Sequence, residues 1–146
     1  MEHLSLGEFN IQAEELAKTL SPHESGATIL ALHGDLGAGK TTFVQQIART
    51  LGISEHVISP TFVIQKQYPL IGQKFSQLVH IDAYRLDTAQ QLEALGWEDM
   101  QKKTENLILI EWPEKVADIL PKSTQHVYFE HLDENSRSIS YEKKEQ

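Results

Sequence analysis

The residues best suited to chemistry lie in one glycine-rich stretch that ends in a lysine and two threonines. Its glycines allow close backbone approaches, so successive amide N–H groups can turn toward an anion. The lysine can reach the β- and γ-phosphates of a nucleotide, and the first threonine hydroxyl can bind Mg²⁺. The pattern G-x-x-x-x-G-K-T is typical of the phosphate-binding loop of ATPases and GTPases. The candidate phosphate-binding residues are Gly34, Asp35, Leu36, Gly37, Ala38, Gly39, Lys40, Thr41 and Thr42.

The sequence on both sides of this loop favours that interpretation over a chance glycine-rich turn. Residues 27–33 form an almost unbroken apolar run, as expected for a parallel strand buried on both faces. After the loop, apolar residues recur at helical spacing until Gly52, which is placed to end a helix. A strand, a phosphate loop and a helix are therefore expected in succession.

Two further apolar strands end in carboxylates. Asp82 follows the run 78–81, and Glu111 follows the run 107–110. In open α/β sheets, ligands bind at the carboxyl ends of the parallel strands. A P-loop enzyme needs an acid there to hold Mg²⁺, and it can use another to orient the attacking water. Asp82 and Glu111 are therefore the candidate acids, although strand-end acids also commonly cap helices.

Several other residues have both a functional and a structural interpretation. Thr61 either senses the γ-phosphate from a loop or starts a strand on the surface. His80 shares a strand face with Asp82, where a lone histidine is more often structural than catalytic. Arg85 either neutralises charge in a transition state or pairs with a surface acid. Trp112 is either a core anchor or a lid over the site.

The rest of the chain predicts one α/β domain over residues 1–146, with a mixed sheet. Residues 61–68 and 75–82 leave no room for a crossover helix between them, so they should form an antiparallel hairpin. A second hairpin is expected from residues 125–132 and 137–141. We therefore expect a P-loop NTPase-like fold in which helices flank parallel core strands and antiparallel hairpins complete the sheet.

The remaining expected elements are shorter. Residues 1–10 should hold a first strand or an arm, and residues 142–146 a frayed tail. The expected helices are residues 11–20 with an Asn10 cap, a short helix capped by Asp87 or Thr88 with Gln90 or Gln91, and residues 113–120 after Trp112.

Composition excludes some classes of function. The chain has 146 residues, a formal net charge of −8 and no cysteine, so disulfides and thiolate metal sites are excluded. Proteins that grip nucleic acid by themselves usually carry a basic excess, so tight direct binding of RNA is not expected. No signal peptide or membrane span is visible, and we expect a cytoplasmic protein.

Taken in order, these motifs resemble the bacterial TsaE (YjeE) family of small P-loop ATPases, over about residues 8 to 121. The histidine–aspartate and glutamate–tryptophan blocks are more specific than the phosphate loop. The blocks that carry the resemblance are Gly34 to Thr42, Ser59-Pro60-Thr61-Phe62, His80-Ile81-Asp82-Ala83-Tyr84-Arg85, Leu92 to Asp99 and Ile110-Glu111-Trp112-Pro113-Glu114.

The resemblance implies an ATPase needed to make threonylcarbamoyladenosine in tRNA. It also implies partnership with the proteins TsaB and TsaD, with tRNA met only through that complex. Carried over, the resemblance places Thr41, Asp82 and Glu111 at a Mg²⁺ site and Lys40 on the phosphates of ATP. It makes Thr61 a switch-like residue that takes part in catalysis with Lys40 and the two acids, and it marks Trp112 as part of the nucleotide site.

Three other functions remain open from the sequence. A small-molecule kinase would normally need an arginine-bearing lid, and the chain has only Arg49, Arg85 and Arg137. A GTPase would normally carry N-K-x-D to read guanine, and this tetrapeptide is absent from the sequence. A subunit that senses ATP without hydrolysing it would carry the same loop as a slow ATPase.

Overall fold

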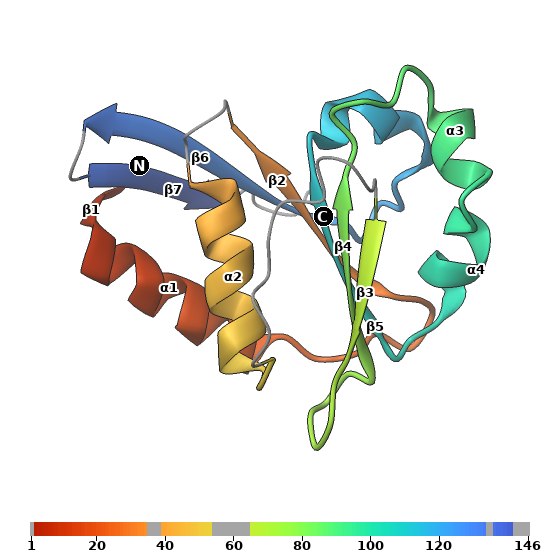
Figure 1. Cartoon of the computed structure of the whole chain (residues 1–146), viewed down its shortest axis with the longest axis horizontal. Coiled ribbons are helices and arrows are strands. Elements are labelled where there is room, and N and C mark those ends of the chain that lie inside the picture. Colours follow the sequence, from red (N-terminus) through yellow and green to blue (C-terminus); the bar gives the residue numbers. More distant parts are fainter. Residues whose placement is uncertain (1, 35–38, 54–64, 134–135, 142–146) are drawn as a thin grey trace.

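The computed structural model describes residues 2–34, 39–53, 65–133 and 136–141. The strands in this part of the chain form one seven-stranded sheet with helices on both faces (Figure 1). Their order across the sheet is β1-β7-β6-β2-β5-β4-β3. The strands are β1 (Glu2–Ser5), β2 (Thr28–His33), β3 (Gln65–Pro69), β4 (Gln77–Asp82), β5 (Asn106–Glu111), β6 (Gln125–Asp133) and β7 (Ser136–Tyr141). This arrangement confirms the predicted mixed α/β fold.

The centre of the sheet is parallel. β2 lies between β5 and β6 and runs parallel to both, and β5 also runs parallel to β4. Every residue of β5 is buried, because helices cover both faces of the sheet there. Neighbouring parallel strands end at the same edge of a sheet. Accordingly, Asp82 at the end of β4 is in register with Glu111 at the end of β5, and Leu32 of β2 is in register with Glu111.

Antiparallel pairs extend the sheet on both sides. β3 pairs with β4, which confirms the predicted hairpin, although residues 61–64 of its predicted first strand lie outside the described residues. Pro69 belongs to the end of β3, one residue beyond the strand predicted over residues 61–68. β3 is an edge strand, where a proline is tolerated because its missing N–H is not needed for pairing. β6 and β7 form the second predicted hairpin, and β1 pairs with β7. The predicted tail 142–146 also lies outside the described residues.

The helices divide into two layers (Figure 1). α1 and α2 pack on one face of the sheet, whereas α3, α4 and the 3-10 helix η1 pack on the other. Each face of the sheet has its own hydrophobic core, and alternate residues of β5 belong to the two cores. Leu107 and Leu109 face α1 and α2, whereas Ile108 and Ile110 face α3 and α4. The helices are α1 (Leu6–Thr19), α2 (Lys40–Thr50), α3 (Ala89–Glu93), α4 (Trp97–Lys102) and η1 (Pro113–Ile119).

The first helix begins five residues earlier than the sequence analysis predicted. Ser5 is its N-cap: the Ser5 hydroxyl accepts from the Glu8 N–H at 3.2 Å, and the Glu8 carboxylate accepts from the Ser5 N–H at 3.2 Å. Asn10 lies inside the helix, so the predicted Asn10 cap is wrong. The reciprocal Ser5–Glu8 pair satisfies the backbone N–H groups of Ser5 and Glu8, and this favours a helix that starts at Leu6. At α3 the N-cap is Thr88 and the capping box is completed by Gln91, which is one of the predicted combinations.

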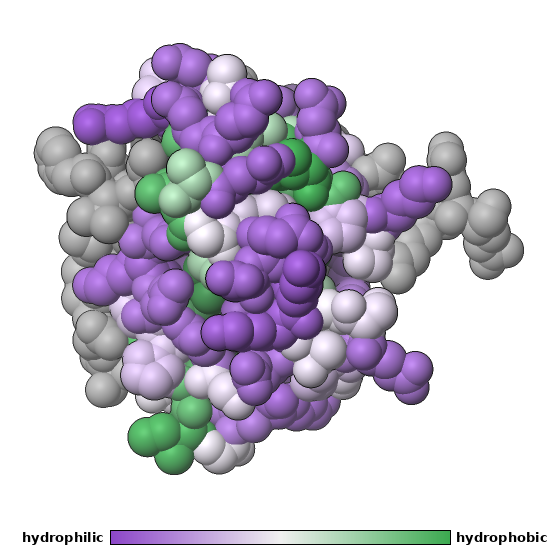
Figure 2. Space-filling view, turned by 90° about the vertical axis from the view of Figure 1, so that its right-hand side faces the viewer, coloured by the Kyte–Doolittle hydropathy of each residue, from purple (hydrophilic) through white to green (hydrophobic). Residues whose placement is uncertain are grey.

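The surface over α3 and α4 is mostly hydrophilic, with hydrophobic side chains in small separate areas (Figure 2). Ile71, in the turn between β3 and β4, is 90% exposed and is the most exposed large hydrophobic side chain in the described part of the chain. No helix in that part is both long enough and apolar enough to cross a bilayer.

Candidate functional site

The candidate site lies at the edge where the parallel strands end. β2 leads to Gly34, and α2 begins at Lys40 directly after Gly39, its N-cap. The first turn of α2 faces the end of β5, where Thr41 meets Glu111, and Asp82 at the end of β4 is in register with Glu111. Four of the nine predicted phosphate-binding residues, Asp35, Leu36, Gly37 and Ala38, lie outside the described residues, as does Thr61.

Glu111 is the centre of the described site. It is 3% exposed, and its carboxylate accepts from the Thr41 hydroxyl at 3.3 Å through Oε1 and at 3.5 Å through Oε2. These distances are longer than the roughly 2.7 Å usual for O–H···O bonds, so the hydroxyl is held loosely. Two residues 70 positions apart in the chain, both predicted to bind Mg²⁺, are thus brought together.

A much shorter hydrogen bond joins Glu111 to His80. The distance from His80 Nε2 to Glu111 Oε2 is 2.6 Å, and His80 is fully buried. An ionised Glu111 carboxylate can only accept, so we assign the hydrogen of this bond to Nε2. The sequence analysis left His80 as either structural or catalytic. The structure shows that it touches a candidate site residue, a contact between two strands that a single sequence could not reveal.

Asp82 is half-buried, and its Oδ1 accepts from the Tyr84 backbone N–H at 3.0 Å. The Ala83 N–H meanwhile donates to the Glu111 carbonyl at 3.0 Å, which ties the chain after β4 to the end of β5. Asp82 therefore has a structural task at the strand end, as such acids often do. Its place beside Glu111 also keeps it within the candidate site.

Lys40 and Trp112 form a second contact in the site. Lys40 is 4% exposed, and its Nζ lies 3.7 Å from the centre of the Trp112 ring, a cation–π distance. The Trp112 ring also lies beside Tyr84, which is 51% exposed, with ring centres 5.1 Å apart. Trp112 thus covers the loop lysine and also packs against the core under α3, α4 and η1, so both predicted interpretations of this ring, lid and core anchor, remain open.

The backbone of Trp112 is strained. Its φ of 58° makes it the only non-glycine residue with positive φ in the described part of the chain. A bulky side chain costs energy in this conformation, and such residues persist where the surrounding structure holds them. Pro113 follows and begins η1. Backbone strain of this kind is concentrated at functional sites, and here it accompanies the ring that contacts Lys40.

The oxygen donors at this edge fit a magnesium–nucleotide better than a free metal ion. Within the described residues no cluster of three or more histidine, cysteine, aspartate or glutamate side chains could hold a metal. Mg²⁺ in nucleotide enzymes is bound by one or two carboxylates together with the phosphates of the substrate. The hydroxyl of Thr41 and the carboxylates of Glu111 and Asp82 supply hard oxygen donors of this kind.

Sequence reasoning missed a cluster at the end of β2. His33, the residue before Gly34, has its Nε2 2.8 Å from His126 Nδ1 on β6. The His33 ring also stacks on Tyr128, with ring centres 4.4 Å apart, and its Nδ1 lies 3.8 Å from the Glu114 carboxylate. The cluster fixes the point where β2 enters the loop. The pairing of β2 with β6, which only the fold reveals, creates it.

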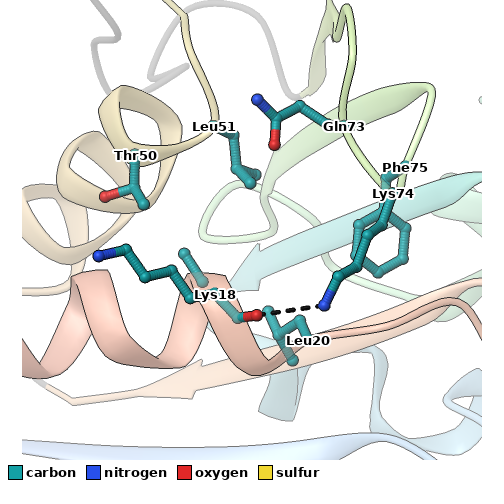
Figure 3. A pocket seen from close by; sticks show the side chains of 8 residues that line it. Lys18, Leu20, Thr50, Leu51, Gln73, Lys74 and Phe75 are labelled. Carbon is teal, nitrogen blue, oxygen red and sulfur yellow. Dashed lines mark hydrogen bonds between the residues drawn. The ribbon is translucent and has the colours of Figure 1, made fainter.

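A separate pocket lies at the other end of α2 (Figure 3). The carboxyl ends of α1 and α2 face it, together with the β3–β4 turn, and Lys74 Nζ donates to the Lys18 carbonyl at 3.2 Å. Helix carboxyl ends carry partial negative charge, so the helix dipoles at this pocket do not favour phosphate. Its lining residues are Ala17, Lys18, Leu20, Thr50, Leu51, Gln73, Lys74 and Phe75.

Comparison with known proteins agrees with the geometry. The family model described as Threonylcarbamoyl adenosine biosynthesis protein TsaE matches residues 8–139. The tRNA threonylcarbamoyladenosine biosynthesis protein TsaE of Rickettsia felis is 39% identical over 129 residues, which cover 88% of this chain and 70% of that protein. The protein of the same name from Bacillus subtilis is 32% identical over 130 residues, covering 89% and 78%. The crystal structure of Bacillus subtilis YdiB has a TM-score of 0.68 and 27% identity, covering 96% of this chain and 84% of that chain. This chain belongs to the TsaE family of threonylcarbamoyl adenosine biosynthesis proteins.

Proposed function

We propose that the chain binds Mg–ATP at the carboxyl edge of its parallel strands and hydrolyses it to support threonylcarbamoyladenosine formation in tRNA. One observation carries the proposal. The hydroxyl of Thr41, at the start of α2, meets the buried carboxylate of Glu111, at the end of β5. A P-loop enzyme needs this pairing of a loop hydroxyl with a strand-end acid.

In this proposal, Lys40 and the backbone amides of the loop from Gly34 onward bind the phosphates. Thr41, Asp82 and Glu111 would hold Mg²⁺, which neutralises negative charge on the phosphate oxygens when bound. The Lys40 ammonium leaves the Trp112 ring to reach the phosphates. Residues 35–38 would contribute further amides of the loop.

Glu111 has a second task in the proposal. It is buried, so its charge acts in a medium where it is screened less than in water. A carboxylate in this position can orient the attacking water and take its proton. Thr61, which lies outside the described residues, is proposed to sense the γ-phosphate as a switch residue.

The names of the relatives place their work in tRNA modification, yet this chain carries a net charge of −8. A nucleic acid surface would repel such a charge. We therefore propose that tRNA is reached through partner proteins, namely TsaB and TsaD, in the cytoplasm. Their turnover would be coupled to binding and hydrolysis of ATP by this chain.

Phosphate release from Mg–ATP tests the proposal, with the chain alone and with TsaB and TsaD added. We expect slow release alone and faster release with the partners. Lys40→Ala should abolish nucleotide binding, whereas Lys115→Ala, an exposed lysine on η1, should not change it. Normal ATP affinity and turnover in Lys40→Ala would refute the loop assignment.

The acids are tested in the same assay. Glu111→Gln should slow release by about 100-fold or more, the usual contribution of a positioned base. Glu105→Gln is the matched control, because this acid is exposed and lies just before β5, at the end opposite Glu111. Release that ignores the partners but rises with a small acceptor would indicate a kinase instead. Binding without release under any condition would indicate an ATP sensor.

A further inference from the structure

We propose that His80 is a positioning residue that lets Glu111 offer a single oxygen to the cation, and that it thereby favours Mg²⁺ over Ca²⁺. The inference rests on the proposed function, because it assumes that Glu111 faces a nucleotide-bound cation. It assigns a task to a side chain whose part in the site the sequence left open.

The two oxygens of the Glu111 carboxylate have different surroundings. Oε2 takes the short hydrogen bond from His80 Nε2 at 2.6 Å. Oε1 is the nearer of the two to the Thr41 hydroxyl, at 3.3 Å against 3.5 Å. A hydrogen bond to an ionised acceptor is shorter and about twice as strong as a neutral one. The carboxylate is therefore fixed through Oε2, and Oε1 is turned toward the start of α2.

The imidazole is well placed to hold this orientation. His80 is 0% exposed, and its register partner on β5 is Leu109, which is also 0% exposed. Its second nitrogen, Nδ1, is buried and has no hydrogen-bond partner among the described residues. Within the part of the chain that the structure describes, the ring has one polar contact, to Glu111, and the close-packed core around it opposes rotation.

The orientation of Glu111 has a consequence for cation choice. Mg²⁺ requires near-octahedral geometry and takes one oxygen from each carboxylate, while keeping several waters. Ca²⁺ takes six to eight oxygens and often binds both oxygens of one carboxylate. The His80 N–H on Oε2 competes with a cation that needs both oxygens of Glu111. It does not disturb a cation that binds through Oε1 alone. Removing that donor should therefore weaken the preference for Mg²⁺.

The experiment measures binding of a non-hydrolysable ATP analogue by calorimetry while Mg²⁺ or Ca²⁺ is varied. His80→Leu removes the donor, and His80→Gln keeps an N–H near Oε2. Thr28→Val is the matched control, because Thr28 is also 0% exposed and donates to the Ser21 carbonyl at 3.0 Å, near the opposite end of β2. All variants are first checked for thermal unfolding.

We expect His80→Leu to raise the Mg²⁺ concentration needed for half-maximal binding by about 10- to 100-fold, the usual effect of losing a residue that orients a metal ligand. The Ca²⁺ requirement should change by less, His80→Gln should recover most of the loss, and Thr28→Val should match the original chain. A folded His80→Leu with an unchanged Mg²⁺ requirement, or with equal losses for both cations, would overturn the inference.

Two further outcomes are also decisive. If leucine prevents folding, His80→Asn takes its place, since its amide is too short to reach Oε2, and a Mg²⁺ requirement equal to that of His80→Gln would refute the positioning role. If the original chain binds the analogue equally well without any divalent cation, the proposed function fails before the role of His80 is reached. The two failures are therefore distinguishable.

Discussion

Gly39 offers a sharp test of how the phosphate loop is attached to the core. Its φ is 104°, and a Cβ added there would lie 3.0 Å from Phe9 Cζ and 3.4 Å from Phe9 Cε2. Phe9 comes from α1, is 1% exposed, and packs against Phe43 and Phe129 with ring centres 5.8 and 5.9 Å away. Its ring therefore has little room to withdraw. Gly39→Ala should strain both the backbone and this aromatic cluster.

The cost can be separated into two parts. An L-residue in the left-handed region loses about 1–2 kcal/mol. Forcing an extra methyl group into a packed core costs a further 1–3 kcal/mol or so. Gly96 supplies the control, because its φ is 92° and a Cβ there would meet nothing within 4 Å. Gly96→Ala should therefore lose only the first part, and Gly39→Ala both, for a total of about 2–5 kcal/mol.

Urea unfolding followed by circular dichroism measures both losses. Phe9→Leu completes a double-mutant cycle with Gly39→Ala, since a smaller side chain relieves the contact but not the backbone strain. The coupling energy should be about 1–3 kcal/mol in favour of the double variant. If Gly39→Ala costs no more than Gly96→Ala, or if the cycle is additive within roughly 0.5 kcal/mol, Phe9 does not brace the loop.

Three more predictions follow from named contacts. The variant Trp97→Phe has Trp112 as its only tryptophan. Saturating Mg–ATP should change the fluorescence emission of Trp112, because Lys40 leaves the ring to reach the phosphates. Unchanged emission, with binding shown by calorimetry, would contradict that movement. Leu109→Ala, at 0% exposure, should cost about 2–5 kcal/mol in urea unfolding, and a loss below roughly 1 kcal/mol would be inconsistent with its packing. Ser5→Ala should cost about 0.5–2 kcal/mol at pH 7. Hydrogen bonds of the Ser5 side chain and backbone lower the pKa of Glu8 from 4.5. The stabilisation that Ser5 gives to the ionised Glu8 carboxylate is therefore present above pH 4.5 and is lost as the pH falls through the pKa of Glu8 in the folded protein. A Ser5→Ala loss that is the same at pH 7 and pH 3 would refute this pH dependence.

Local patterns were sufficient to predict much of this protein. Continuous apolar runs mark strands buried on both faces, and the order of loop, helix and strand-end acids follows from residue type and spacing. The hairpin of β3 and β4 followed from chain length alone, because too few residues separate the strands for a crossover. Helix starts were less certain, since Asn10 and Ser5 are both good caps and only Ser5 has Glu8 three residues later to complete the box.

The contacts within the site were decided by the tertiary structure. Spacing within a strand shows that His80 and Asp82 share a face, but it does not show which side chains of a neighbouring strand they meet. Parallel pairing of β4 with β5 places His80 within 2.6 Å of Glu111. The turn after β5 likewise sets the Trp112 ring against Lys40, 72 positions earlier in the chain. The sequence by itself determined the chemical groups and the strand ends that carry them, because these depend on local period and residue type. Only the fold determined which of those groups touch, because strand register and helix packing are set by residues far apart in the chain.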